Sequence, residues 1–443
     1  MAKSWQAAHI KQTGKEPTTA NPTTIPIYNH NKERSNMTVK RILANCKVLD
    51  FTHALAGPTT TRLMAEMGAD IIKVELAPRG DMTRAMAYNK NGRSGYFIQQ
   101  NRGKKSLCLD MRKSASVDII KKLIADTDVL IENYSPGVIA DMGLGWDVVK
   151  DINPQLIYCS ISAFGQTGPL SHLPGFDYMG QAYAGVTSLM GYPQEAPIMP
   201  AISIGDVNTG VHALAAINGA LFYRSQGGGG QYIDCSLLDS YFHCHDLSVQ
   251  LHSNSNGKMQ PTRNGRHHPA VAPDGIYRGR DSCMFVIAVT AKQWKALCRV
   301  MDRADMLTDS RFRTNADRVA NLAALIEIIE GWIQSMPSDT AAREALEAAR
   351  VPVAPVLTPG EAMQHPHLIE RGTVRTISDR GMGEFQIPGM PLRFSECPEL
   401  LTLEAPYLGE HNASILRDRL AMSEAEIRQL MASEVLHGEA VPG

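Results

Sequence analysis

One carboxylate, Asp206, stands where it could react with a ligand. It follows a glycine in the stretch AISIGDVNTGVHALAAINGALFY (201–223), at a turn that leads into a helix of small and apolar residues. A carboxylate in this position can act as a nucleophile, and an aspartate is ordinarily ionised at pH 7 without a helping base. It can equally serve as a helix N-cap, which stabilises the helix by about 1 kcal/mol. The residue alone leaves both interpretations open.

Three other motifs suggest ligand sites, but their chemistry favours structural interpretations. The HCHD run (His243 to Asp246) points neighbouring side chains in different directions on a helix, which disfavours a metal site. The turn HALAGP (53–58) lacks the glycine pattern of a dinucleotide site, because Pro58 replaces a required glycine. The four glycines at 227–230 precede a strand, so they favour a helix stop over a phosphate-binding loop. The sequence therefore predicts neither a metal ion nor a nicotinamide cofactor.

Composition narrows the range of partners. The formal net charge is −1, which gives no reason to expect nucleic acid as a partner. No apolar run approaches the roughly 18 residues that span a bilayer, so no membrane partner is expected. The eight cysteines are scattered without a C-x-x-C pair, a usage typical of buried thiols in a reducing compartment. We therefore expect a cytoplasmic protein, or a mitochondrial matrix protein if the source is eukaryotic.

The elements that must position Asp206 alternate between strands and helices. Short apolar runs predict strands, and helical periodicity separates several of them. The predicted strands are KVLDF (47–51), IIKVE (71–75), VLIE (129–132), QLIYCSIS (155–162) and YIDCS (232–236). This alternation predicts a doubly wound, Rossmann-like α/β fold with a parallel sheet covered on both faces. Ligands of such sheets bind beyond the carboxyl ends of the strands.

The chain divides into segments of different character. Residues 1–41 are polar and lack apolar periodicity, so we expect a disordered N-terminal extension. The sequence leaves open whether translation begins at Met1 or Met37. Residues 42–255 form the first part of the large Rossmann-like domain, and 265–355 are expected to form a smaller α+β domain with a hairpin at 275–290. Residues 356–443 are expected to rejoin the large domain.

Several ordered segments carry a resemblance to a known family. They are VLDFTHALAGP, IIKVE, GDMTR, KKSLCLDM, VLIENYSPG, NPQLIYCSIS and IGDVNTGVHAL, followed by HPHLIERGT (365–373) and PYLGEH (406–411). In this order they resemble the family III CoA-transferases, from about residue 44 to the end of the chain. The family includes formyl-CoA transferase, which this sequence is similar to. So many ordered matches are far more specific than any single motif.

The resemblance implies a catalytic role for Asp206. In the family, the aspartate at this position attacks an acyl-CoA thioester and forms an aspartyl anhydride and then an aspartyl-CoA thioester. Asp177 aligns with a glutamate that lies near the catalytic aspartate. A second carboxylate close by would raise the pKa of one member of the pair. The implied function is transfer of CoA from an acyl-CoA donor to a carboxylic acid acceptor.

The resemblance also implies a binding site for coenzyme A, which enters as a thioester substrate and not as a permanently bound cofactor. The positions that match CoA-contacting residues are His53, Ala56, Leu109, Arg112, Asn133 and Tyr134. Leu76 and Asp141 replace two arginines that contact CoA in formyl-CoA transferase. The adenosine end must then be held by other cations, of which Arg79, Arg84 and Lys105 are the candidates. The partners implied are acyl-CoA and small carboxylic acids.

Two departures bear on the substrate and on alternative functions. Leu55 replaces a catalytic-site glutamine of formyl-CoA transferase, which makes formate or oxalate improbable as the specific acid.

The superfamily also contains α-methylacyl-CoA racemases, whose chemistry needs an acid and a base on opposite faces of a carbon. Those enzymes carry histidine where this chain has Phe176, which cannot transfer a proton, so transfer is favoured over racemisation. An inactive CoA-binding protein is a third possibility, against which the retained Asp206 argues. The resemblance further implies an interlocked homodimer.

Overall fold

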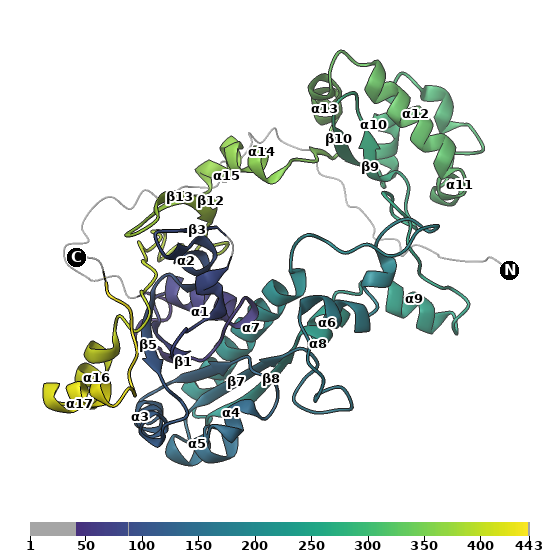
Figure 1. The fold of residues 1–443 in the computed structure, drawn as a ribbon. Helices are drawn as coiled ribbons and strands as arrows, with labels where there is room; N and C mark the ends of the chain where they lie inside the picture. The colour runs from purple at the N-terminus through teal and green to yellow at the C-terminus, as the bar shows by residue number, and fades with distance from the viewer. Residues whose placement is uncertain (1–40, 87, 442–443) are drawn as a thin grey trace, which may run out of the picture. The chain divides into compact units, whose positions relative to one another are not determined.

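The computed structural model describes residues 41–86 and 88–441 of the chain. The predicted disordered extension (1–41) therefore lies almost entirely outside the described residues. The central feature is a sheet of six strands, all paired in parallel. These strands are β1 (Lys47–Asp50), β2 (Asp70–Leu76), β5 (Lys104–Leu109), β6 (Val129–Glu132), β7 (Ile157–Ser162) and β8 (Gln231–Ser236). The predicted Rossmann-like α/β fold is confirmed (Figure 1).

The strand order β5-β2-β1-β6-β7-β8 determines where a ligand can bind. The chain runs outward from β1 through β2 to β5, then returns to the other side of β1 and runs outward again. The direction of winding thus reverses between β1 and β6. In open α/β sheets the crevice beyond the carboxyl ends of the strands at such a reversal is the usual ligand site. The loops that follow β1 and β6 meet there.

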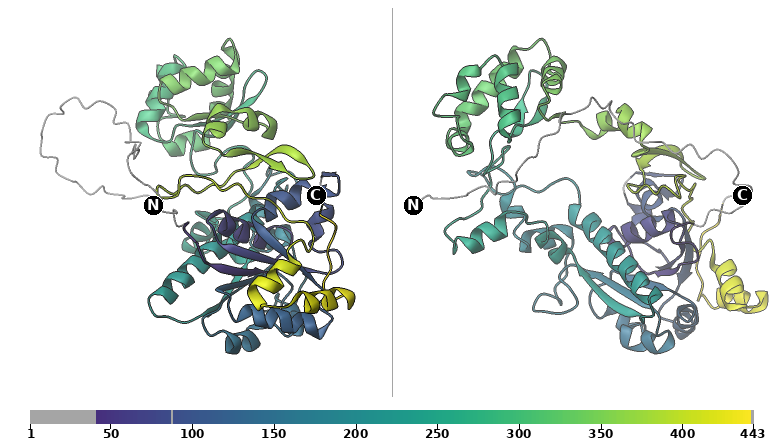
Figure 2. Two further views of the ribbon diagram at one scale, coloured as in Figure 1. Left: turned by 90° about the vertical axis from the view of Figure 1, so that its left-hand side faces the viewer. Right: turned by 180° about the vertical axis from the view of Figure 1, so that it is seen from behind.

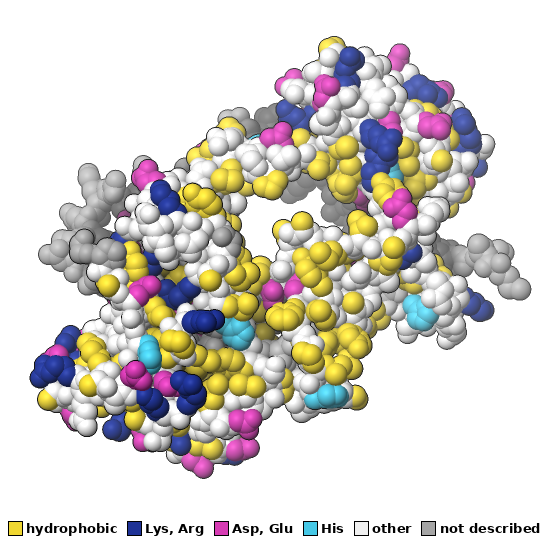
Figure 3. All heavy atoms as spheres, viewed as in Figure 1, with side chains coloured by type: hydrophobic (Ala, Val, Ile, Leu, Met, Phe, Trp, Pro, Cys, Tyr) yellow, Lys and Arg dark blue, Asp and Glu magenta, His cyan; other side chains and the backbone are white. Residues whose placement is uncertain are grey.

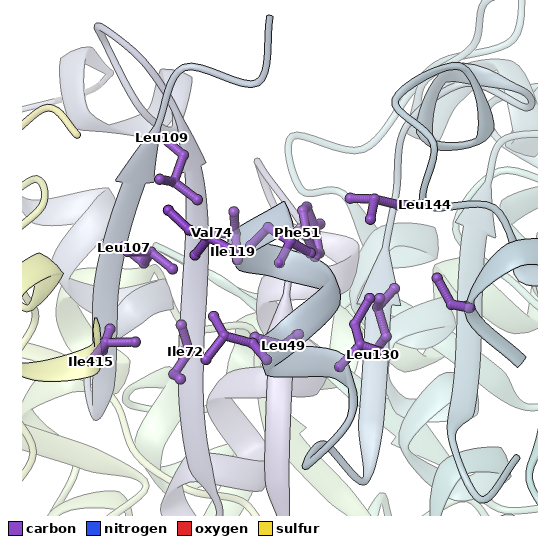
Figure 4. Packing of buried hydrophobic residues seen from close by; sticks show 14 of the residues in the cluster. Leu49, Phe51, Ile72, Val74, Leu107, Leu109, Ile119, Leu130, Leu144 and Ile415 are labelled. Atoms are coloured by element: carbon purple, nitrogen blue, oxygen red, sulfur yellow. The ribbon is translucent and has the colours of Figure 1, made fainter. Parts of the chain in front are cut away.

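Alternate residues of each strand pack into separate cores on the two faces of the sheet. On one face, Leu49 and Leu130 join residues of α3 (Ser114–Ile124), α5 (Trp146–Ile152), α16 (Asn412–Leu420) and α17 (Glu424–Ala432). Figure 4 shows part of this cluster. On the other face, Val48 and Ile131 join residues of α1 (Ala56–Glu66) and α7 (Ile204–Ser225). The strands are therefore buried on both sides, as expected for parallel sheets.

The C-terminal helices lie beside strand β5 at one edge of the sheet, although they are far from this strand in the sequence. The views in Figure 2 show α16 and α17 next to α3 and β5, and α16 contacts both. The side chain of Asn412 accepts the N–H of Cys108 at 2.9 Å, and Leu436 forms a single antiparallel bridge with Leu109. The end of the chain thereby closes the β5 edge of the sheet.

Residues 274–355 contain their own antiparallel sheet and apolar core. The sheet has the order β11-β10-β9, with β9 (Asp274–Arg278), β10 (Cys283–Ile287) and β11 (Val353–Pro355). The hairpin expected at 275–290 is present as the β9–β10 pair. Around it lie α10 (Ala291–Val300), α11 (Asn315–Ala320), α12 (Leu322–Ser335) and α13 (Asp339–Ala348), whose buried residues form one cluster. Capping boxes start α10 at Thr290 and α11 at Thr314.

The remaining described elements are short. They are η1 (Met82–Ala85), β3 (Asn89–Lys90), β4 (Arg93–Ser94), α2 (Gly95–Asn101), α4 (Val138–Asp141), α6 (Asp177–Tyr183), η2 (Thr187–Leu189), α8 (Leu237–Phe242), α9 (Ser248–Asn254), η3 (Ala304–Leu307), α14 (Pro359–Gln364), α15 (Pro366–Glu370), β12 (Val374–Asp379) and β13 (Gly383–Pro388). Strands β12 and β13 form an antiparallel hairpin. No helix among the described residues is long and apolar enough to cross a membrane.

A close approach of α1 and α7 fixes the helix that carries Asp206. A Cβ atom added to Gly210 would lie 2.5 Å from the carbonyl oxygen of Ala56, so only glycine allows this contact. The hydroxyl of Thr60 on α1 donates to the Gly210 carbonyl at 2.8 Å. The position of Asp206 relative to the β1–α1 turn is therefore set by backbone contact and not by flexible side chains.

Candidate active site

Asp206 lies in the first turn of α7 but is not its N-cap. The helix begins at Ile204, and the N-cap residue is Ser203, whose side chain makes no capping hydrogen bond. The half-buried Asp206 carboxylate forms no hydrogen bond or ion pair with any described residue. The N-cap interpretation of Asp206 is therefore wrong, and its carboxylate is available to a ligand.

Asp177 performs the capping that Asp206 does not. It is the first residue of α6 and is 3% exposed. Its Oδ1 accepts the backbone N–H of Asp206 at 2.7 Å, and its Oδ2 accepts the hydroxyl of Tyr241 at 2.7 Å. The Tyr241 oxygen in turn accepts a hydrogen bond from the Gln181 amide at 3.2 Å. The structure thus brings the two predicted carboxylates together and holds Asp177 rigidly.

The glycine before Asp206 is required by this arrangement. A Cβ atom on Gly205 would lie 2.0 Å from the Tyr241 ring and 2.7 Å from Asp177 Oδ1. Any side chain at Gly205 would push α8 and α6 away from the start of α7. The Gly-Asp pair of the sequence therefore allows the second carboxylate to approach Asp206.

The environment of Asp206 changes its acidity. Burial, and secondarily the negative charge of Asp177, raise the pKa of Asp206 to about 7. With a pKa of about 7, Asp206 would be only partly ionised at pH 7, unlike the ordinary aspartate that the sequence suggests. A carboxylate whose pKa lies near the working pH is more basic than an ordinary one, and perturbed values of this kind are typical of functional sites.

Tyr96 is a neighbour of Asp206 that the sequence analysis missed. It is the second residue of α2, two positions after the N-cap Ser94. Burial first, and then the charges of Asp206 and Asp81, raise the pKa of Tyr96 to about 12, so its hydroxyl keeps its proton. A lone tyrosine in a polar stretch carries no sequence pattern that distinguishes it from a packing residue.

A cavity of about 220 Å³ lies at the carboxyl ends of β1 and β2, where the winding reverses. His53 and Tyr134 line it, and their rings lie 5.4 Å apart. The Asn133 side chain accepts the backbone N–H of His53 and donates to the His53 carbonyl, both at 2.8 Å. These reciprocal bonds join the loops after β1 and β6. Three of the predicted CoA-contacting residues are thus brought together.

The turn after β1 is held in an unusual backbone conformation. Ala54 has φ of 63°, a left-handed value that costs a non-glycine residue about 1 kcal/mol or more. A buried lysine supports the turn, since Lys73 Nζ donates to the Thr52 carbonyl at 2.6 Å and pairs with Asp81 at 2.9 Å. Ala56 follows as the first, buried residue of α1. Strained turns of this kind are common where a ligand must be met by the backbone.

The other predicted CoA-contacting residues lie apart from this cavity. Leu109 is fully buried in the core between the sheet and α3. Arg112 follows β5, with its side chain 84% exposed and paired to Asp110 at 2.8 Å. Lys105 lies near the amino end of β5 and pairs with Asp70 at 2.8 Å. Because the cavity is at the carboxyl ends, the structure does not bring Lys105 to it.

Two of the three cations considered for the adenosine end are occupied. Arg84 forms two hydrogen bonds with Glu75, at 2.7 and 2.8 Å, and stacks over Phe97. Lys105 is paired with Asp70 as described above. Arg79 lies in the turn after β2, is exposed, and forms no ion pair with any described residue. Among the residues described, no group of three or more possible ligands is arranged to hold a metal ion.

Comparisons with known proteins agree with this fold. The sequence profile described as CoA-transferase family III matches residues 43–412. The human succinyl-CoA:glutarate CoA-transferase is 32% identical over 407 residues, which cover 91% of this chain and 92% of that protein. A formyl-CoA:oxalate CoA-transferase of Streptomyces coelicolor is 32% identical over 90% of this chain and its own entire length. A solved structure of a CAIB/BAIF family protein from Brucella suis has a TM-score of 0.75 and 33% identity, covering 86% of this chain and 100% of that one.

The chain therefore belongs to CoA-transferase family III. It is a CoA-transferase of acyl-CoA metabolism, as the resemblance of its ordered motifs implies. Enzymes of this family use acyl-CoA substrates.

Proposed function

We propose that this enzyme moves CoA from an acyl-CoA donor to a carboxylic acid acceptor with Asp206 as the covalent nucleophile. The observation that carries the proposal is the unpaired carboxylate of Asp206, held beside Asp177 at the start of α7. A structural carboxylate that is half-buried would be expected to have a hydrogen-bonding partner. Asp206 has none among the described residues, and the neighbouring backbone is fixed by glycine contacts.

The reaction consists of four acyl exchanges. A carboxylate oxygen of Asp206 attacks the thioester carbonyl and the C–S bond breaks. CoA departs as the thiolate, and a mixed anhydride between Asp206 and the donor acid is formed. The thiolate then attacks the aspartyl carbonyl of the anhydride, releasing the donor acid and forming an aspartyl-CoA thioester. The acceptor carboxylate attacks this thioester and forms a second anhydride with release of thiolate. Attack of the thiolate on the acceptor carbonyl gives the new acyl-CoA and restores Asp206.

The surrounding residues suit these steps. We assign Asp177 a positioning role, since it fixes the backbone of Asp206 and makes the attacking carboxylate more basic. We assign the protonated hydroxyl of Tyr96 as a donor to the oxyanion that develops on the thioester carbonyl. Because an anhydride hydrolyses readily, the reaction also requires that water be kept from the site.

We place the CoA thioester in the cavity between His53 and Tyr134, where Asn133 joins the loops that carry these two residues and Ala56 begins the adjoining helix α1. Burial lowers the pKa of His53, so its ring is neutral and can pack against an uncharged pantetheine arm. For the nucleotide phosphates we assign Arg79, which alone of the three cations Arg79, Arg84 and Lys105 forms no ion pair with a described residue, with Arg112 a second candidate. Leu109 remains a prediction from the resemblance alone. Lys105 remains a prediction made because two CoA-contacting arginines of the family are replaced in this chain.

The identity of the acids is proposed only by class. The relatives named above act on short acids such as glutarate and oxalate, according to their names. Leu55, the residue that precedes α1, offers this chain an apolar side chain near the turn after β1. We propose an acid larger or less polar than oxalate. Racemisation finds no support, because Phe176 beside Asp177 carries no transferable proton.

We further propose that the enzyme is an interlocked homodimer in which α7 contacts the second copy. Val207, Val211 and Phe222 are 44%, 45% and 68% exposed and share one side of the helix by their spacing, and Tyr223 beside them is 58% exposed. Figure 3 shows hydrophobic side chains gathered on the face that carries α6, α7 and α8. An exposed apolar surface of this kind marks a protein interface more often than a solvated face. The division into large and small domains, at 42–255 with 356–443 and at 265–355, remains part of this proposal.

Steady-state kinetics test the proposed reaction. Donor acyl-CoAs and acceptor acids are varied together for the wild type, Asp206→Asn and the exposed control Asp418→Asn. The proposal predicts ping-pong kinetics, loss of transfer in Asp206→Asn by about 10³-fold or more, and an unaffected control. Transfer retained by Asp206→Asn would contradict the nucleophile. Exchange of an α-hydrogen for deuterium without transfer would favour an isomerase instead.

A further inference from the structure

The buried carboxyl of Glu132 lies two residues before Tyr134, which lines the cavity, and takes no part in the proposed chemistry. It is the last residue of β6 and is 2% exposed. No lysine or arginine among the described residues pairs with it. On the neighbouring strand β7, Ser160 is paired with Glu132, and on the next strand β8, Asp234 is paired with Ser160. The carboxyl thus sits at the carboxyl end of the central strands with only hydrogen bonds to compensate its burial.

Such a carboxyl is costly to the fold. Burial raises the pKa of Glu132 to about 7, while hydrogen bonds from Ser160 and the Tyr134 backbone oppose the shift and Asp234 adds to it. The other titratable groups that face it are Tyr134, Tyr158, Cys159 and Tyr232, and none of them is a cation at neutral pH. The same strand places Leu130 in the apolar core on this face. An apolar residue at position 132 would pack there at lower cost.

The hydrogen bonds of Glu132 point to what it does. Its Oε2 accepts the backbone N–H of Tyr134 at 2.8 Å. The intervening residue, Asn133, is the one that exchanges hydrogen bonds with the backbone of His53, and the Tyr134 ring lies beside the His53 ring. The hydrogen bond from Tyr134 to Glu132 therefore constrains the same turn that lines one wall of the cavity. Tyr134 and Asn133 also line a second hollow beside β7, together with Ser162 and Phe164.

We propose that Glu132 is a positioning residue for the CoA thioester, holding the Asn133–Tyr134 turn in the conformation that binds it. This inference rests on the proposed placement of CoA between His53 and Tyr134. It does not depend on whether Asp206 is the nucleophile. Glu132 acts through the turn and does not touch the substrate, so its effect belongs to binding and not to the chemical steps.

Two substitutions separate positioning from packing. Glu132→Gln keeps a side-chain oxygen that can accept the Tyr134 N–H, while Glu132→Leu has similar bulk, removes the acceptor and suits the apolar surroundings. Binding of free CoA to the full chain is measured by calorimetry, with thermal melting as the check on folding. KM and kcat for the acyl-CoA donor are measured in parallel.

The inference predicts that Glu132→Leu weakens CoA binding and raises KM by about tenfold, with kcat changed less than about twofold. Glu132→Gln should remain within about threefold of the wild type, and Glu132→Leu should melt no lower than the wild type. Unchanged CoA affinity in Glu132→Leu, or a loss confined to kcat, would overturn the inference. A wild type that does not bind CoA would overturn it together with the proposed site. If CoA binds normally but Asp206 proves not to be the covalent nucleophile, only the proposed function is contradicted.

Discussion

The acidity of Asp206 is set by the groups around it. Burial is the larger cause, and the neighbouring carboxylate of Asp177, which accepts the N–H of Asp206, adds to it, so the pKa of Asp206 rises to about 7. Only the ionised form can attack a thioester. The fraction of reactive enzyme therefore grows as the pH rises through this value.

The pH profile of the reaction checks this relation. We expect kcat/KM to rise with pH and to level off above about 7. In Asp177→Asn the side-chain oxygen can still accept the Asp206 N–H, but the negative charge is gone, so the rising limb should move to lower pH. The exposed variant Asp418→Asn provides the control. If the rising limb of the pH profile of Asp177→Asn coincides with that of the wild type, or lies at higher pH, Asp177 does not set the acidity of the nucleophile.

Arg79 can be tested by removing part of the substrate. Arg79→Ala should raise KM for an acyl-CoA about five- to tenfold, because a charge-assisted contact with phosphate is lost. The same variant should treat the corresponding acyl-pantetheine thioester, which has no nucleotide, like the wild type. Arg303→Ala, which removes an arginine distant in sequence, is the control. Equal losses with both thioesters would show that Arg79 does not contact the nucleotide.

Some of the individual residues of the site could be predicted from the sequence. Asp206, Asp177, His53, Asn133 and Tyr134 could be named because each belongs to a motif that resembles the family. Tyr96, Lys73 and Glu132 could not, because their roles depend on burial and on neighbours brought close by the fold. The raised pKa of one member of the Asp206–Asp177 pair could be predicted, but the larger contribution of burial to it could not.

At the scale of elements, the contact between α1 and α7 determines where Asp206 lies. The Gly210 position touches the Ala56 carbonyl, and Thr60 bonds to the Gly210 carbonyl. A larger residue must separate the two helices. Since the turn after β1 is attached to α1, such a separation moves Asp206 away from this turn, whose His53 lines the cavity.

Substitution of Gly210 tests this dependence. Gly210→Val should lower kcat by at least about tenfold, because a displacement of about 1 Å at a reacting group can cost this much or more. Gly331→Ala, in the middle of α12 where a Cβ atom meets nothing, is the matched control and should leave turnover unchanged. Wild-type kcat in Gly210→Val would contradict the proposed role of the helix contact.

The alternation of strands and helices was predictable from the apolar pattern, because strands buried on both faces are continuously hydrophobic. The hairpin at 275–290 was predictable for a similar reason. The strand order was not, since periodicity does not tell which strand lies beside which. Nor could the bridge between Leu109 and Leu436 be foreseen, because it joins segments far apart in the sequence.

At the scale of the whole molecule, the exposed apolar side of α7 calls for a covering partner. The proposed partner is a second copy of the chain. We expect wild-type protein to sediment as a dimer, and Val211→Glu combined with Phe222→Glu to sediment as a monomer, because the interface would bury unpaired charges. Val148→Glu, at a 43% exposed position on α5, is the control. A monomeric wild type, or a dimer that survives both changes, would contradict the proposed interface.

The central claim is that Asp206 carries the acyl group or CoA during transfer, and trapping of the intermediate tests it most directly. The full-length enzyme is mixed with an acyl-CoA donor, quenched with hydroxylamine, and mapped by peptide mass spectrometry, with Asp206→Asn as the blank. We expect a hydroxamate on Asp206 that appears only when donor is present. Continued transfer with no modification of Asp206, or with the modification on another residue, would contradict it.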